Sequence, residues 1–282
     1  EHNYIEEVWD AIADPEKYVV VQTAPAVRVG LGEALNLSAG ERVTGKMVAA
    51  LRRLGFNSVL DTDFSADLTI LEEGTELLHR LKANLVDKDN KEPLPMTTSC
   101  SPGWVKFFEH IYPEMLSHMS TCKSPQQMFG ALAKTYYAKK IDVDPAKMVC
   151  VSIMPCTAKK FEADRPEMRD SGYKDVDYVL TTRELAIMIK QAGIEFADLP
   201  NEGFDTIMGK STGAGGIFGA TGGVMEAALR TVYEIVTGRE VPFKDLNITP
   251  VRGLEGVKEA NVKIEKALPE YKFLEGVEVK RA

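Results

Sequence analysis

Hydrophobic and polar residues alternate in blocks along the chain, and the blocks predict strands and helices in turn. The run YVVVQ at residues 18–22 has the uninterrupted, β-branched pattern of a buried strand. Helical patterns follow as far as Leu37 and then from Ser38 to Gly55, and NSVLD at 57–61 predicts the next strand. Strand, helix and strand in this order indicate a parallel sheet with right-handed crossovers.

The same alternation continues along the rest of the chain. We expect a helix over 65–82, a short strand at 94–99, a helix from Trp104, strands at 148–155 and 176–181, helices at 183–193 and 224–238, and strands in the tail. We therefore predict an α/β fold of two lobes, residues 1–140 and 141–282, each a mostly parallel sheet flanked by helices.

Composition narrows the class of protein. Asp and Glu number 42 against 34 Lys and Arg, which gives a net charge of −8 and argues against a nucleic-acid partner. No apolar run reaches the roughly 20 residues that cross a bilayer, and the first residues lack the apolar core of a signal peptide. The four cysteines have no CxxC spacing, so we expect a reducing, cytoplasmic location and not a disulfide scaffold.

Two of the cysteines follow predicted strands. Cys100 lies in TTSCSPGW and Cys156 in IMPCTAKKFE, each just past the end of an apolar run. Ligands collect at the carboxyl edge of an open α/β sheet, and helix N-termini there favour a thiolate. Iron–sulfur ligation and buried packing both remain open for this pair, whereas Cys150, inside MVCVSI, is expected to pack in the core.

A pair of carboxylates and a glycine-rich run also invite interpretation. Glu73 and Glu76 lie three residues apart in LEEGTELLHR, a spacing typical of a proton relay or of a solvated helix face with Arg80 as a surface partner. The run TGAGGIFGATGG contains no phosphate-binding signature. Its glycines fit the close approach of backbone to a bulky ligand, or a flexible loop.

Taken in order, five motifs resemble the catalytic domain of [FeFe]-hydrogenases. They are VVVQTAPAVRVGLGEA, TTSCSPGW, STCKSPQQMFGALAKTYYA, IMPCTAKKFEADRPEM and STGAGGIFGATGGVMEAALR. The resemblance runs from about residue 4 to the last residue. IMPCTAKKFE matches the family's second signature, MPCxxKxxE, at every fixed position, and TSCSPGW matches the first, TSCCPxW, except at Ser101.

The resemblance implies an H-cluster, in which a [4Fe–4S] cubane is joined through a cysteine to a two-iron subcluster, in the cleft between the lobes. It implies reversible reduction of protons to hydrogen. Cys156 falls on a cluster ligand, Cys100 on the family's proton-relay cysteine, and Lys159 on the lysine that donates to an iron-bound cyanide. Glu73, Glu76 and Ser120 fall on the proton path. Positions lining the two-iron pocket correspond to Ala24, Pro25, Gln126, Met154, Pro155 and Phe218.

The sequence departs from the family at two points. Ser101 stands where the family has a cluster-binding cysteine, so we expect that Cys100 binds iron there, that Ser101 does, or that the cluster is held weakly. The third signature, which supplies two further cysteine ligands, is expected beyond residue 282, so we expect an incomplete domain; Cys122 and Cys150 lack its spacing.

The resemblance further implies a set of partners. It implies maturation proteins and an electron carrier, either a ferredoxin or an NAD-linked subunit. A sensory or iron–sulfur assembly relative without turnover, and a metal-free interaction module of the same fold, are the alternatives.

Overall fold

The chain folds into two compact units that interleave in sequence. A computed structural model describes residues 2–89, 91–206, 208–219, 222–242, 249–250 and 258–281. Unit 1 comprises Glu1–Leu68, Cys100–Lys106 and Lys123–Thr212, and unit 2 comprises Thr69–Ser99, Phe107–Cys122 and Gly213–Ala282. Two helices, α4 (Asp63–Lys82) and α5 (Pro102–Ile111), have residues in both units.

Unit 1 is built on a parallel sheet of four strands in the order β2-β1-β3-β4. These strands are β1 (Tyr18–Thr23), β2 (Ser58–Asp61), β3 (Met148–Met154) and β4 (Tyr178–Thr181). All seven residues of β3 are buried, as are the last five of β1, which explains why both read as continuous apolar runs. The expected α/β fold with a parallel sheet is confirmed.

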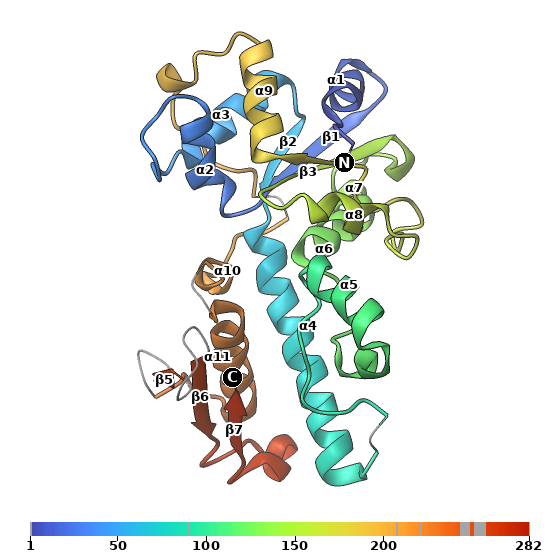
Figure 1. The fold of residues 1–282 in the computed structure, drawn as a ribbon, viewed down its shortest axis with the longest axis vertical. Helices are drawn as coiled ribbons and strands as arrows, with labels where there is room; N and C mark the ends of the chain where they lie inside the picture. Colours follow the sequence, from blue (N-terminus) through green and yellow to red (C-terminus); the bar gives the residue numbers. More distant parts are fainter. Residues whose placement is uncertain are drawn as a thin grey trace. The chain divides into compact units, whose positions relative to one another are not determined.

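Helices flank this sheet. Unit 1 contains α1 (Ile5–Ala13), α2 (Val27–Ala34), α3 (Thr44–Leu54), α6 (Pro125–Leu132), α7 (Ala138–Lys140), α8 (Ala158–Asp164) and α9 (Thr182–Gln191), with short helical turns at Ala133–Tyr137, Pro145–Lys147 and Phe196–Asp198. Figure 1 shows α2, α3 and α9 gathered together on one side of the strands. Their apolar faces join the strands in one large core.

The expected division near residue 140 cuts through this sheet. β1 pairs with β2 on one side and with β3 on the other, so strands from both sides of residue 140 lie in the same unit. Local sequence patterns identify strands but do not show which strands pair. The boundary near residue 140, which we inferred from such patterns, therefore does not follow the pairing.

Unit 2 differs from the second parallel lobe that we expected. Its described strands, β5 (Thr249–Pro250), β6 (Lys258–Lys263) and β7 (Glu278–Arg281), pair antiparallel. Its other elements are most of α4, the end of α5, α10 (Ala214–Ile217), α11 (Gly223–Thr237) and helical turns at Ala83–Asp87, Pro113–His118 and Pro269–Leu274. A second, smaller core joins α4, α11 and the segment after β6.

Two expected elements differ locally. The predicted strand at 94–99 is reduced to a single bridge between Thr97 and Met119, because its neighbour is a loop and not a strand. The helix expected from Ser38 begins at Thr44 and ends, as expected, at Gly55, whose φ of +106° is the left-handed conformation of a helix C-terminus. The helices expected over 65–82, 183–193 and 224–238 start and end within two residues of those bounds.

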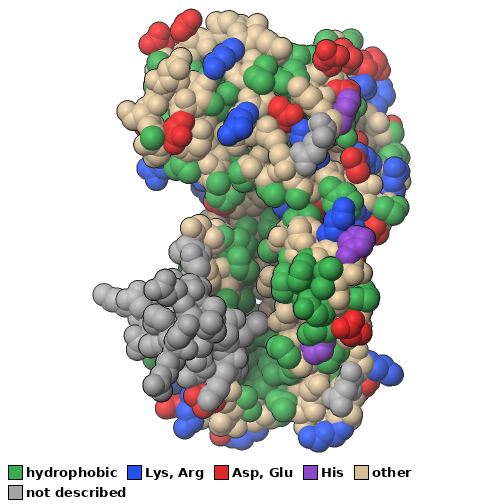
Figure 2. All heavy atoms as spheres, in the orientation of Figure 1, with side chains coloured by type: hydrophobic (Ala, Val, Ile, Leu, Met, Phe, Trp, Pro, Cys, Tyr) green, Lys and Arg blue, Asp and Glu red, His purple; other side chains and the backbone are tan. Residues whose placement is uncertain are grey.

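Parts of the surface are apolar. Hydrophobic side chains gather over α5 (Figure 2), where Phe107 and Ile111 are exposed while Phe108 is buried. None of the helices in the described ranges combines the length and the hydropathy that crossing a bilayer requires.

Candidate functional site

The turn after β3 presents Cys156 at the carboxyl edge of the parallel sheet. Met154, the last residue of β3, is buried, and Pro155 and Cys156 follow it as exposed residues. The Lys159 backbone N–H, in the first turn of α8, donates to the Cys156 carbonyl at 3.2 Å. The sequence therefore ends a buried strand with an accessible thiol beside a helix N-terminus, the arrangement expected from the pattern.

The second predicted turn carries Cys100 and Ser101. Cys100 is half-buried, and Ser101 is exposed directly before α5. The Ser101 Oγ accepts a hydrogen bond from the Trp104 N–H at 3.5 Å, as the side chain of a helix N-cap residue does. A helix-capping role thus accounts for a serine at this position without any ligand.

Lys159 joins these two turns. Its ammonium donates to the Cys100 carbonyl at 2.8 Å, and its backbone is bonded to Cys156. The same Nζ lies 3.0 and 3.1 Å from the two carboxylate oxygens of Glu162, one turn along α8. The structure thus brings together Cys100, Cys156 and Lys159, which the sequence placed in separate motifs.

Glu162 is a residue that the sequence interpretation left without a role. Its side chain is 5% exposed and accepts hydrogen bonds from Ser124 Oγ at 2.8 Å and Gln126 Nε2 at 2.9 Å. The signal for it was present, since it is the last fixed position of MPCxxKxxE and lies three residues after Lys159. Gln126, predicted to line a pocket, is therefore also bonded to α8 through Glu162 and the Lys159 carbonyl.

Ala24 and Pro25 lie at the end of the neighbouring strand. The Ala24 N–H donates to the Ile153 carbonyl at 3.0 Å, so the turn after β1 is bonded to the last residues of β3. Ala24 is buried and Pro25 half-buried. Ala24, Pro25 and Met154 thus lie at the carboxyl ends of adjacent strands, and their lining of a common pocket stays a prediction.

The other predicted residues lie in unit 2, where Glu76 forms the centre of a hydrogen-bonded network. Its carboxylate accepts from Ser120 Oγ at 2.7 Å, from the Thr121 N–H at 3.1 Å and from Arg80 Nη2 at 2.6 Å. Burial alone would raise the pKa of Glu76, but the hydrogen bonds from Ser120, Arg80 and Thr121 lower it. Glu73, one turn earlier on α4, is buried.

Arg80 differs from the surface partner that its spacing suggested. Its side chain is 1% exposed, and its guanidinium also donates to the carbonyls of Pro93, Ser117 and Met119. Opposite charges at positions i and i+4 predict the contact between Arg80 and Glu76. They do not predict that Arg80 is buried, because the loops that cover Arg80 are distant in sequence.

Cys122 adjoins the same carboxylate. Its thiol lies 3.6 Å from Glu76 Oε2, and its N–H donates to Ser120 Oγ. Burial, with the nearby Glu76 charge, raises the pKa of Cys122 to about 12, so the side chain stays a thiol. Cys150 is fully buried in β3, which confirms its packing role.

Phe218 follows α10 and is half-buried, with its N–H bonded to the Gly215 carbonyl. It is described here within unit 2, whereas Cys100, Cys156 and Lys159 belong to unit 1. Ala220 and Thr221 of the glycine-rich run lie outside the described residues.

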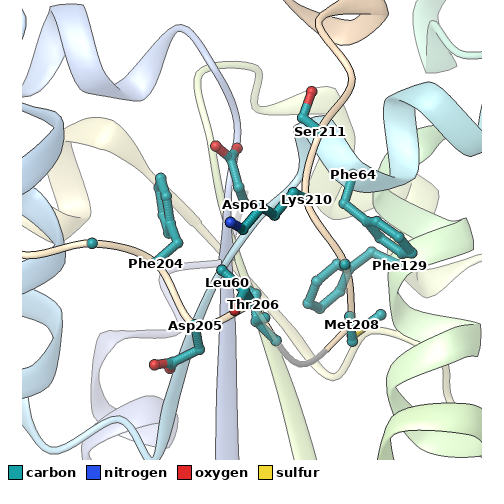
Figure 3. Close-up of a pocket in the computed structure, with 12 residues that line it drawn as sticks. Leu60, Asp61, Phe64, Phe129, Phe204, Asp205, Thr206, Met208, Lys210 and Ser211 are labelled. Carbon is teal, nitrogen blue, oxygen red and sulfur yellow. The ribbon is translucent and has the colours of Figure 1, made fainter.

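A cavity of about 290 Å³ opens beside the end of β2 (Figure 3). Its apolar lining includes Leu60, Phe64, Phe129 and Met208, and its charged residues are Asp61, Asp205 and Lys210. None of the residues predicted from the sequence lines it, so it is distinct from the turns that carry the cysteines.

Two observations bear on whether these residues fit an iron–sulfur group. Cys156 is exposed and its carbonyl is bonded to the Lys159 backbone. The Gln126 Oε1 is buried with no hydrogen-bond partner in the part of the chain that the structure describes. Thiolate and cation fit an anionic iron–sulfur group. Within the same ranges, no three His, Cys, Asp or Glu side chains are grouped so that they could hold a metal ion by themselves.

Comparison with known proteins identifies the family. The profile described as "Iron only hydrogenase large subunit, C-terminal domain" matches residues 17–281. The chain is 59% identical to the NADP-reducing hydrogenase subunit HndD of Solidesulfovibrio fructosivorans, over 94% of this chain and 45% of that protein. It is 52% identical to the periplasmic [Fe] hydrogenase large subunit of Nitratidesulfovibrio vulgaris, over 93% of this chain and 61% of the relative.

Solved structures agree with these matches. An apo structure of a variant of the [FeFe]-hydrogenase HydA1 from Chlamydomonas reinhardtii superposes with a TM-score of 0.79 and 47% identity, over 93% of this chain and 65% of that one. A more distant relative, the cytosolic Fe-S cluster assembly factor narfl of Xenopus tropicalis, is 33% identical over 80% of this chain and 48% of its own length. The chain spans about half the length of the curated relatives that it matches, and it belongs to the family of iron-only hydrogenase large subunits.

Proposed function

We propose that this chain is the greater part of an [FeFe]-hydrogenase catalytic domain, which reversibly reduces protons to hydrogen. The observation that carries the proposal is the bridge from Lys159 to the Cys100 carbonyl, beside Cys156 at the carboxyl edge of the sheet. It links two of the family's cysteine signatures through a cation that suits an anionic cluster.

An H-cluster, when bound, supplies the electron chemistry that interconverts two protons and hydrogen. In this chain, the Cys156 thiolate would bind its cubane part, and Ser101 or Cys100 would occupy the position of a second ligand. A serine oxygen is a harder and poorer ligand for iron–sulfur iron than a thiolate. Ala24, Pro25, Gln126, Met154, Pro155 and Phe218 would line the pocket and exclude water.

Protons would move through Glu73, Glu76 and Ser120 to Cys100. Support comes from the Ser120 hydroxyl, which donates to Glu76 at 2.7 Å, a distance at which a proton can be exchanged. Each of these groups can both give and accept a proton. If Cys100 binds iron in place of Ser101, it cannot also relay protons.

The proposed hydrogenase would need an electron carrier and a cellular location. The name of the HndD relative refers to a subunit of an NADP-reducing hydrogenase, which supports an NAD-linked subunit as the electron carrier. A ferredoxin is the other carrier that we propose. Maturation proteins would install the cluster. We propose a cytoplasmic location, although the name of another relative places that protein in the periplasm.

Infrared spectroscopy of the matured full-length protein tests the function. We expect bands from iron-bound CO and cyanide, together with hydrogen evolution from a reduced dye. Cys156→Ala should lose cluster iron, whereas Cys150→Ala, a matched change at a buried thiol of β3, should retain it. Matured protein without CO and cyanide bands would contradict the proposal.

Ser101→Cys tests the departure from the family. If position 101 faces the cluster, the added thiolate should raise the iron content and slow cluster loss to a chelator. Unchanged iron retention would show that Ser101 acts only as a cap of α5.

One alternative has specific support. The similarity to narfl, together with Ser101, is compatible with an iron–sulfur assembly protein that does not turn over hydrogen. Such a protein should bind iron and sulfide yet show no CO or cyanide bands, so the same infrared measurement separates the two functions.

A further inference from the structure

Four polar side chains of unit 1 form a buried group, which we call the Glu162 cluster: Lys159, Glu162, Ser124 and Gln126. Its centre is the Glu162 carboxylate, which accepts from the other three. The Glu162 side chain is 5% exposed and that of Lys159 14%. Removing either charge would leave the other in a poorly solvated place without its partner, so the two charges depend on one another.

The carboxylate is held from an element other than the helix that carries it. Ser124 is the N-cap of α6, where its Oγ accepts the Gln127 N–H, and the same hydroxyl donates to Glu162 at 2.8 Å. Gln126 Nε2 donates to Glu162 at 2.9 Å from the first turn of α6. Because α6 fixes these two donors, they hold the Glu162 carboxylate in place independently of Lys159.

Lys159 then has little freedom. An ammonium carries three N–H donors. One is directed at the Cys100 carbonyl at 2.8 Å, and Glu162 lies 3.0 and 3.1 Å from the nitrogen on another side. A lysine side chain otherwise has many rotamers, so two fixed acceptors are needed to hold its charge at one point.

We propose that Glu162 is a positioning residue: anchored by Ser124 and Gln126, it fixes the Lys159 ammonium beside the Cys100 carbonyl and so holds the Cys100 turn against the Cys156 turn. The effect of Glu162 on the cluster rests on the proposed function, in which Lys159 would donate to an anionic ligand of the cluster. The anchoring of Lys159 itself follows from the contacts and can be measured without any cluster.

The next residue on α8 provides a matched control. Lys160 Nζ lies 2.7 Å from Glu184 Oε1, and the two side chains are 7% and 13% exposed. This pair has the same chemistry and similar burial, but it connects α8 to α9, and Lys160 also donates to the His2 carbonyl at 2.7 Å. In the described part of the chain its hydrogen bonds do not involve Cys100, Ser124 or Gln126. Glu184→Gln also keeps a side chain that can complete the capping box of α9.

The first experiment measures the coupling in the full-length protein without its cluster. Chemical denaturation of wild type, Glu162→Gln, Lys159→Met and the double variant forms a double-mutant cycle. We expect coupling of at least about tenfold in the unfolding equilibrium constant, because directly bonded groups are not additive. A cycle that closes additively would overturn the anchoring of Lys159 by Glu162.

The second experiment records cyanide infrared bands of the matured protein. Glu162→Gln should shift or broaden one cyanide band, Ser124→Ala should shift the same band less, and Glu184→Gln should leave all bands at their wild-type positions. Bands of Glu162→Gln that match wild type would show that Glu162 does not position Lys159 toward the ligand. If wild type itself lacks the bands, the proposed function fails, while the cycle still decides whether Glu162 holds Lys159.

Discussion

Asp63, in the first turn of α4, shows how burial changes the behaviour of a single carboxyl group. The residue is 7% exposed, and the Asp61 carboxylate lies close to it. Burial, then the charge of Asp61, raises the pKa of Asp63 to about 6, although Arg28 opposes this. Near neutral pH the folded protein therefore carries an ionised group that its surroundings disfavour.

We predict that Asp63→Asn changes how stability depends on pH. An aspartate in the unfolded chain has a pKa of about 4, below that of the folded protein. The folded state therefore binds more protons between these two values, so the stability that Asp63 contributes is present below about pH 4 and lost as pH rises through 6. Asn lacks this loss, and above pH 7 the variant should be more stable by about 1–2 kcal/mol.

Urea denaturation at a series of pH values from 4 to 8 measures this difference. Asp170→Asn, which changes an aspartate whose side chain is 71% exposed, is the control and should follow the wild-type profile. Parallel profiles for Asp63→Asn and wild type would rule out the assigned role of Asp63.

At the scale of elements, helix α6 packs through a glycine. A Cβ at Gly130 would lie 2.6 Å from the Asp175 carbonyl oxygen and 2.7 Å from Val176 Cγ2. No φ in the left-handed region is required at this position, so the glycine is there for space alone. This close approach holds α6, with its Glu162 donors, against the segment that leads into β4.

Gly130→Ala should therefore destabilise the protein. We expect a loss of about 1–3 kcal/mol, because backbone atoms must move to admit the methyl group. Gly103→Ala, in α5 with nothing within 4 Å of the added atom, should be neutral or gain about 0.5–1 kcal/mol from helix propensity. Denaturant midpoints of the two variants provide the test, and equal midpoints would contradict the packing argument.

Elements differed in how well the sequence predicted them. The strands YVVVQ and MVCVSIM were recognisable because strands covered on both faces have continuous apolar runs. LPMTTS at 94–99 has a similar pattern over a shorter length, but within the described ranges it forms only a single bridge, which no local pattern could reveal. At the site, the position of each cysteine after a strand was predictable, whereas the burial of Arg80 and Glu162 depended on segments that fold over them.

At the scale of the whole molecule, the sheet of unit 1 needs both halves of the chain. β1 lies between β2 and β3, and its register with β3 runs over six residue pairs, from Tyr18 with Met148 to Thr23 with Ile153. A chain that ends at residue 140 would leave one side of β1 without its hydrogen bonds.

We predict that residues 1–140 do not fold alone. The fragment should show no cooperative denaturation and no near-ultraviolet circular dichroism, in contrast to the 282-residue chain measured alongside. The reason is the missing partner strand, which no residue of the fragment replaces in the described sheet. A cooperative transition of the isolated fragment would contradict the pairing as the source of its stability.

The place of β1 in the sheet also bears on how the protein is made. During synthesis, β1 leaves the ribosome long before Met148–Met154, the strand beside which it belongs. Throughout that interval its apolar residues, Val19 to Val21, have an open edge that can pair with a neighbouring nascent chain. Slow translation or crowded polysomes should therefore favour aggregation of this protein, and chaperones that bind short apolar segments should protect it by covering β1 until β3 arrives.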